Sequence, residues 1–126
     1  FNFDSAAGII YTVDVTKPKG EKITIISMAD GTPFSMDKMY KVALNSYRGN
    51  GGGELLTKGA GIPQDELKGR ILFSTDKDLR YYLMQYIEKK GVIEPHALGQ
   101  WKFIPEEWVE PAAKRDYEYL FGKVEK

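Results

Sequence analysis

Apolar and polar residues alternate along two stretches near the N-terminus. In residues 9–15 the odd positions carry Ile, Tyr, Val and Val, and the even positions carry Ile, Thr and Asp. Residues 22–28 are rich in β-branched Ile and Thr. Side chains of a β-strand point alternately to its two faces, so both patterns are typical of strands. Because the link between them is short, we predict that the two strands pair in antiparallel fashion.

Two later stretches also have strand character. Residues 40–46 form an apolar run after a short connector, and we predict a third strand there, in an antiparallel meander with the first two. Residues 100–104 read Gln-Trp-Lys-Phe-Ile and predict one more strand. Pro105 follows it and suits a sheet edge, because proline cannot donate a ladder hydrogen bond.

Apolar residues at spacings of three and four predict two helices. The first is opened by Thr75 as N-cap, with Asp78 reaching back in a capping box, and Gly91 ends it. The second covers residues 112–121, with Pro111 near its start and Gly122 at its end. We expect both apolar stripes to pack in the core. The first stripe is Leu79, Tyr82, Leu83, Tyr86 and Ile87, and the second is Ala113, Tyr117, Leu120 and Phe121.

These elements predict an α+β fold, with a largely antiparallel or mixed sheet and flanking helices. The chain has 126 residues, of which 42% are hydrophobic, so it is long enough for one domain with a real core. Nothing in its composition marks an internal boundary. We therefore expect residues 1–126 to form a single domain.

A glycine-rich loop follows residues 40–46. Four of the five residues from Gly49 to Gly53 are glycine, and Tyr47 lies just before them. Glycine at this density favours positive φ angles or the close approach of another molecule. A flat ring beside exposed amides suits a planar ligand. A mobile connection remains an alternative, whereas a Walker loop lacks its Gly-Lys-[Ser/Thr] and a dinucleotide fingerprint lacks its βαβ unit.

Composition excludes several functional classes. Lys+Arg and Asp+Glu balance at 18 each, which argues against binding to nucleic acid polymers or anionic membranes. No cysteine is present, and no stretch approaches the ~20 apolar residues of a membrane span. His96 is the single histidine and is expected on the surface. The acidic pairs Asp76/Asp78 and Glu106/Glu107 are expected at helix starts. With no nucleophile, base and orienting group together, the isolated chain is expected to be catalytically inactive.

Two segments together resemble a known family. They are Phe-Asp-Ser-Ala-Ala-Gly-Ile at residues 3–9, with Tyr-Thr-Val-Asp following, and residues 37–53, which end in Asn-Gly-Gly-Gly. Both are similar to the C-terminal domain of the 5′-nucleotidase family, which includes UDP-sugar hydrolases and 2′,3′-cyclic-nucleotide phosphodiesterases. The resemblance is specific over residues 3–53 and looser beyond them. It implies a periplasmic or extracellular protein of nucleotide catabolism.

The resemblance implies roles for individual residues. In the family this domain binds the nucleoside between two aromatic rings, which match Phe3 and Tyr47, and a polar side chain matching Ser5 meets the base edge. The remaining candidates for substrate binding are Asn45, Asn50, Gly51, Gly52, Gly53 and Glu54. The family usually has Gly-Gly-Asp-Gly, whose aspartate holds the ribose, and here Gly53 takes that position. Either Glu54 substitutes for the aspartate or ribose recognition is weakened.

The resemblance also implies what the chain would need. The family's dinuclear divalent metal site and hydrolytic chemistry belong to a separate N-terminal metallophosphatase domain. That domain and the first part of the C-terminal domain have no counterpart in residues 1–126, and the chain begins with Phe, so we expect a fragment or processed product. No cofactor is expected within it. The second hypothesis is a non-catalytic interaction domain that kept the fold and lost its ligand, with open sheet edges pairing as a homodimer.

Overall fold

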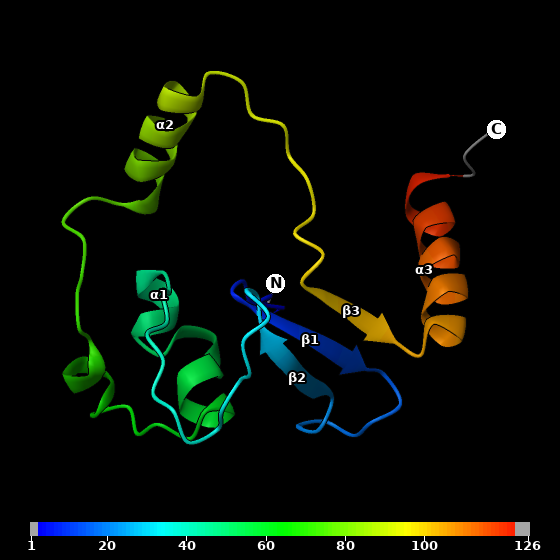
Figure 1. The fold of residues 1–126 in the computed structure, drawn as a ribbon, viewed down its shortest axis with the longest axis horizontal. Helices are drawn as coiled ribbons and strands as arrows, with labels where there is room; N and C mark the ends of the chain where they lie inside the picture. Colours follow the sequence, from blue (N-terminus) through cyan, green and yellow to red (C-terminus); the bar gives the residue numbers. More distant parts are fainter. Residues whose placement is uncertain (1–2, 123–126) are drawn as a thin grey trace. The chain divides into compact units, whose positions relative to one another are not determined.

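The structure is a computed structural model that describes residues 3–122. It divides into two compact units, which are treated separately below (Figure 1). Among the described residues, unit 1 comprises residues 39–96, and unit 2 comprises residues 3–38 and 97–122.

Unit 2 is built on a three-stranded sheet. The strands are β1 (Ile9–Asp14), β2 (Ile23–Met28) and β3 (Trp101–Ile104), in the order β2-β1-β3. The β1 and β2 strands pair antiparallel, as their alternation and short link predicted, and β3 runs parallel to β1. The sheet is therefore mixed, and the predicted α+β class is confirmed.

The prediction of a third strand at residues 40–46 is wrong. Residues 40–45 have no regular structure, and residue 46 already begins helix α1 (Ser46–Gly49). The side chain of Asn45 caps this helix by accepting a hydrogen bond from the backbone N–H of Arg48 at 2.8 Å. An apolar run forms a strand only where a neighbour completes its hydrogen bonds, and here the cap starts a helix instead. The predicted meander is wrong as well, because β3 supplies the third strand.

Unit 1 consists of short helical segments and one longer helix. After α1 come the 3-10 turn η1 (Gly52–Glu54), the π-helical turn η2 (Leu55–Gly59) and the 3-10 turn η3 (Leu67–Arg70). The longer helix is α2 (Leu79–Lys90). Its cap is Asp78, whose carboxylate accepts from Tyr81 N at 3.0 Å, and not Thr75 as predicted, because the Thr75 hydroxyl bonds the Lys77 carbonyl. Gly91 ends α2 as expected.

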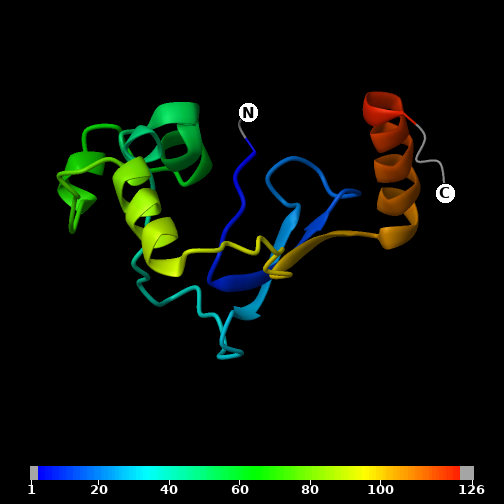
Figure 2. The ribbon, with the colours of Figure 1, turned by 90° about the horizontal axis from the view of Figure 1, so that it is seen from above.

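The last helix, α3 (Glu106–Phe121), begins earlier than residues 112–121. Pro105 precedes it, the acidic Glu106 and Glu107 fill its first turn, and Pro111 lies inside it. Acidic side chains favour a helix N-terminus, which explains why this start prevails over the one that Pro111 suggested. The helix follows β3 directly and ends at Gly122, as predicted (Figure 2).

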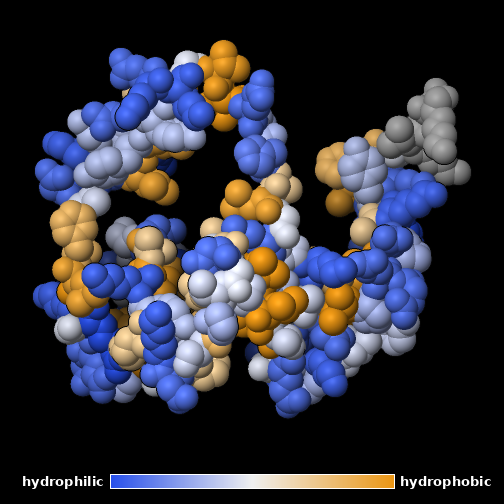
Figure 3. Space-filling model, viewed as in Figure 1, coloured by the Kyte–Doolittle hydropathy of each residue, from blue (hydrophilic) through white to orange (hydrophobic). Residues whose placement is uncertain are grey.

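Each unit buries few side chains. Among the described residues, the buried hydrophobic side chains are Tyr11 in unit 2 and Leu67 in unit 1. No described residue of α2 or α3 is buried, so the expected core packing of their apolar stripes is wrong. Periodic spacing identifies an apolar face of a helix but not what covers it. Figure 3 accordingly shows hydrophobic residues lying open on the surface of the chain.

Candidate functional site: the Tyr47 loop and the Phe3 arm

The glycine loop of unit 1 continues directly from α1. Asn50 ends the helix, and its backbone N–H donates to the Ser46 carbonyl at 2.9 Å. The chain then turns at Gly51, whose φ of 92° lies in the left-handed region, and again at Gly53, with φ of 69°. Glycine adopts these angles without steric cost. The loop is therefore a folded turn with defined angles rather than an open connection.

Gly52 lies against the ring of Tyr47. A Cβ atom added at Gly52 would be 2.6 Å from Tyr47 Cε2 and 2.5 Å from the Tyr47 carbonyl oxygen. Only a residue without a side chain fits this space. Tyr47 nevertheless keeps 58% of its surface exposed, so its ring is supported on one side and open to solvent on another.

Arg48 is the buried charged residue of the described chain, with 7% of its surface exposed. Its Nη1 donates to the Gly52 carbonyl at 3.2 Å, and its guanidinium carbon lies 5.4 Å from the centre of the Tyr47 ring. Sequence reasoning missed this residue. No signal could have found it, since a charged residue in a polar loop is ordinarily solvated.

Side chains from residues 62–67 also support the glycine loop. Gln64 Nε2 donates to the Asn50 carbonyl at 3.0 Å. A Cβ at Gly51 would lie 2.5 Å from Gln64 Oε1 and 3.1 Å from Leu67 Cδ1. Because Leu67 is buried beneath this turn, Gly51 is required both by its φ angle and by close packing.

Glu54 is the single non-glycine residue with positive φ, at 61°, among residues 3–122. This angle is strained for a residue with a side chain. The Glu54 carboxylate lies 2.7 Å from Lys58 Nζ, and both side chains are largely exposed. An exposed pair of this kind contributes ~0–1 kcal/mol, so the carboxylate can change partners at small cost.

Residues 3–8, the N-terminal arm of unit 2, contain the other predicted ring. Phe3 lies 5.6 Å from Trp101 and 6.2 Å from Phe103, measured between ring centres, and is 63% exposed. Trp101 in turn stacks on Tyr11 at 5.9 Å with an interplanar angle of 12°. These supporting rings were not predicted as part of the site. The alternation of Trp101 and Phe103 on one face of a predicted strand was the signal that could have indicated them.

Two hydrogen bonds fasten this arm to the sheet. The Ala6 N–H donates to the Tyr11 hydroxyl at 3.1 Å, and the Gly8 N–H donates to Gln100 Oε1 at 3.0 Å. Ser5 is exposed within the arm. The structure thus gathers Asn45, Tyr47 and residues 50–54 in unit 1, whereas Phe3 and Ser5 belong to unit 2. The base sandwich between Phe3 and Tyr47 stays a prediction.

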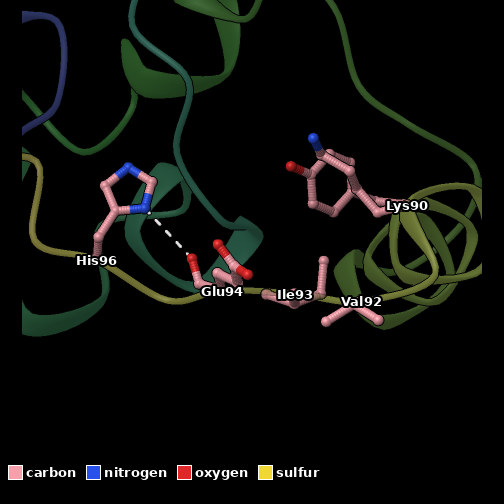
Figure 4. A pocket seen from close by; sticks show the side chains of 6 residues that line it. Lys90, Val92, Ile93, Glu94 and His96 are labelled. Carbon is pink, nitrogen blue, oxygen red and sulfur yellow. Dashed lines mark hydrogen bonds between the residues drawn. The ribbon is translucent and has the colours of Figure 1, made fainter.

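A separate pocket of about 270 Å³ lies at the end of α2 in unit 1 (Figure 4). It is lined by Tyr86, Lys90, Val92, Ile93, Glu94 and His96. His96 is exposed, as predicted, and its Nδ1 lies 3.2 Å from the Glu94 carbonyl oxygen. None of the predicted site residues lines this pocket, so the glycine loop of unit 1 and the N-terminal arm of unit 2 are each kept as a candidate binding surface.

The ionisable groups of the described residues with shifted pKa values are three carboxylates. Within residues 3–122, no three His, Cys, Asp or Glu side chains come close enough to hold a metal ion. The pKa of Glu106 is lowered by its hydrogen bond and ion pair with Lys102, and that of Asp14 by hydrogen bonds from Thr16. Hydrogen bonds from Thr32 likewise lower the pKa of Asp30. All three carboxylates lie outside the candidate site.

The described residues form an α+β fold in which both predicted rings, Phe3 and Tyr47, are exposed. Residues 2–58 match the family model described as 5′-nucleotidase, C-terminal domain. This part of the chain belongs to that family, which confirms the resemblance seen in residues 3–53. The match includes every predicted site residue, from Phe3 to Glu54. No solved structure matches the chain.

Two curated proteins are similar over most of the chain. The trifunctional nucleotide phosphoesterase protein YfkN of Bacillus subtilis is 30% identical over 116 residues, which covers 83% of this chain and 7% of that protein. A 2′,3′-cyclic-nucleotide 2′-phosphodiesterase/3′-nucleotidase of Haemophilus influenzae is 27% identical over 120 residues, covering 83% of this chain and 17% of its own length. The chain thus spans a small part of each relative. Among its described helices, none is long and apolar enough to cross a membrane.

Proposed function

We propose that this chain is the nucleotide-recognition part of a 5′-nucleotidase-type phosphoesterase, which hydrolyses nucleotides to nucleosides and phosphate. The base lies between the rings of Phe3 and Tyr47, and the chain alone is inactive. The observation that carries the proposal is that the family match contains two exposed rings, each supported from behind by other residues. Stacking on such rings is worth ~1–3 kcal/mol per base and tolerates any base.

Within residues 3–122, no group of three His, Cys, Asp or Glu side chains is placed to hold a metal ion. We assign the metal pair and the hydrolysis to an N-terminal metallophosphatase domain of a longer protein. This chain then holds the nucleoside so that the phosphate reaches those metals, which is catalysis by positioning. The relatives' names, a nucleotide phosphoesterase and a cyclic phosphodiesterase/3′-nucleotidase, agree with such a parent protein, for which we propose a periplasmic or extracellular location.

Titration with AMP, adenosine and ribose 5-phosphate, followed by NMR of the 126-residue chain, tests the base site. We expect the two nucleoside-containing ligands to shift the ring signals of Phe3 and Tyr47, and ribose 5-phosphate to leave them in place. Tyr47→Ala should weaken AMP binding by about 5- to 150-fold, the equivalent of one stacking contact. Tyr119→Ala is the matched control, because Tyr119 is 89% exposed and lies on α3.

Contacts between one bound nucleotide and both rings would show the sandwich directly. A folded chain whose ring signals do not respond to saturating adenosine would contradict the proposal. That outcome would favour the second candidate, a domain that retains the fold and serves in protein interactions. Gly53, which cannot supply a carboxylate for the ribose, is the observation on its side. Sedimentation of the same sample would then show whether the chain forms homodimers.

For the ribose, we propose that Glu54 substitutes for the missing aspartate. A glutamate that keeps a strained φ of 61°, where glycine would be relaxed, is best explained by a need for its carboxylate. We expect Glu54→Gln to weaken adenosine binding and leave adenine binding unchanged. Glu54→Gly should do the same while raising the free energy of unfolding by about 1 kcal/mol, since it removes the strain. Equal binding of adenosine by the wild type and both variants would exclude this role.

A further inference from the structure

The buried guanidinium of Arg48 requires an explanation, because removing a charge from water is unfavourable unless the group has close partners. Arg48 is 7% exposed although it lies in the short helix α1, whose other residues are exposed or half-exposed. Two of its contacts converge on the candidate site. One is the hydrogen bond to the Gly52 carbonyl, and the other is the placement of the guanidinium over the Tyr47 ring.

These contacts connect three residues around the ring of Tyr47. Tyr47 lies against Gly52, Gly52 is held by Arg48, and Arg48 lies over Tyr47. The ring therefore has one neighbour at its edge and a cation over a face, while 58% of its surface stays exposed. Arginine suits this arrangement because its planar group stacks on aromatic rings and donates hydrogen bonds in fixed directions.

We propose that Arg48 is a positioning residue for nucleotide binding. It holds the Tyr47 ring and the Gly52 carbonyl together, so that one face of the ring is backed and another is presented to the base. This proposal rests on the base-binding function proposed above. Its physical content, a ring fixed by Arg48 before any ligand binds, can be tested without a nucleotide.

The ligand-free test uses the magnetic effect of the Tyr47 ring on its neighbour. Because Gly52 lies against the ring, its Hα signals should be displaced from their usual position in the wild-type spectrum. We expect Arg48→Gln to move these signals toward their usual position, and Arg48→Lys to have a smaller effect. Arg80→Gln is the matched control, since Arg80 is an exposed arginine on α2. A folded Arg48→Gln variant with unchanged Gly52 signals would overturn the proposal.

The ligand test measures AMP affinity in the same variants. We expect a loss of about 3- to 30-fold for Arg48→Gln, the range of a partly desolvated cation–π contact, and none for Arg80→Gln. If the wild-type chain binds no nucleotide, the function proposed above fails, and the Gly52 signals still decide whether Arg48 fixes the ring. Unchanged AMP affinity in Arg48→Gln, with wild-type binding intact, would contradict the positioning role.

A second pair of variants covers the case in which Arg48→Gln does not fold. Gly52→Ala keeps Arg48 in the chain but forces Tyr47 to shift, because the added Cβ would lie 2.5 Å from the Tyr47 carbonyl oxygen and 2.6 Å from Tyr47 Cε2. Gly49→Ala is the control at the end of α1, where a Cβ meets nothing within 4 Å. We expect Gly52→Ala to shift the Tyr47 ring signals and weaken AMP binding, and Gly49→Ala to do neither. Identical behaviour of the two variants would overturn the proposal.

Discussion

Phe3 and Tyr47 are both exposed rings, yet the two units support them by opposite means. Phe3 rests on Trp101 and Phe103, residues almost a hundred positions away along the chain, which β3 brings beside β1. Tyr47 rests on residues within five positions of itself, Arg48 and Gly52. The first support depends on a sheet having formed, and the second on the angles of one loop.

This difference explains why aromatic residues support Phe3, whereas an arginine and a glycine support Tyr47. A sheet holds side chains at fixed spacing on its faces, so apolar rings placed two residues apart are sufficient. A loop has no such lattice. It needs glycines that adopt left-handed φ angles. It also needs a side chain that bonds to the backbone of the turn, and here the buried arginine does so. The two supports should therefore respond differently to substitution.

The largest effect is expected on the Phe3 side, from Trp101→Ala. This change removes the ring that touches Phe3, Tyr11 and Phe103 together. We expect the free energy of unfolding of unit 2 to fall by about 2–3 kcal/mol, less than for a fully buried ring because Trp101 is half-buried. Residue-resolved urea unfolding measures it.

Trp108→Ala is the control for this change, because Trp108 is 63% exposed and a surface substitution costs within about 0.5 kcal/mol. The Phe3 ring signals should move in Trp101→Ala and stay in Trp108→Ala. If Phe3 is unaffected by the loss of Trp101, its support does not come from the sheet, and the contrast with Tyr47 disappears.

A smaller effect is expected on the Tyr47 side, from Asn45→Ala. The Asn45 side chain caps α1 through Arg48 N, and losing a cap costs about 1 kcal/mol. Asn45→Asp keeps the acceptor and should keep the stability of the loop. Hydrogen exchange at the Arg48 amide measures the cap in both variants.

The same pair separates two roles of Asn45. The resemblance implied that Asn45 binds substrate, whereas the structure shows it as a cap. If Asn45→Asp keeps the cap and AMP affinity, the residue serves the fold of the loop alone. Should AMP affinity fall while the cap is intact, Asn45 also contacts the ligand.

Sequence patterns predicted those parts of the fold in which local chemistry decides the outcome. The alternation in β1 and β2 and the glycines that end α2 and α3 all behave as expected. The prediction of a strand at residues 40–46 was wrong because alternation and apolarity do not show whether a partner strand exists. Asn45 before Ser46, a favourable N-cap, was the local signal for a helix.

The candidate site likewise has features that the sequence predicted and features that it did not. Gly51 and Gly53 were predicted from composition, and their positive φ angles show why glycine is needed. The burial of Arg48 and the aromatic support of Phe3 could not be predicted, because both depend on contacts that no local pattern specifies. The apolar stripes of α2 and α3 failed for this reason too, since spacing defines a face and not its partner.

The smallest expected effect is the response to acid, which acts on unit 2. Hydrogen bonds from Thr16 lower the pKa of Asp14 in the folded chain, and Thr32 and Lys102 do the same for Asp30 and Glu106. A folded pKa below the unfolded value stabilises the protein above the unfolded pKa, and this stabilisation is lost as the pH falls through the folded pKa. We therefore expect unit 2 to weaken below about pH 4, the ordinary range of these carboxyls.

Thr16→Val tests the origin of this response. It removes the hydroxyl that bonds Asp14 at 2.6 Å but keeps the backbone N–H bond at 2.9 Å, so the loss of stability below pH 4 should become smaller without vanishing. Thr32→Val changes the equivalent turn, where Thr32 bonds Asp30 at the same two distances, and should have an equal effect. Thermal unfolding between pH 7 and pH 2 measures both. A variant with a wild-type pH profile would show that the hydroxyl bond to its turn aspartate does not contribute to the response to acid.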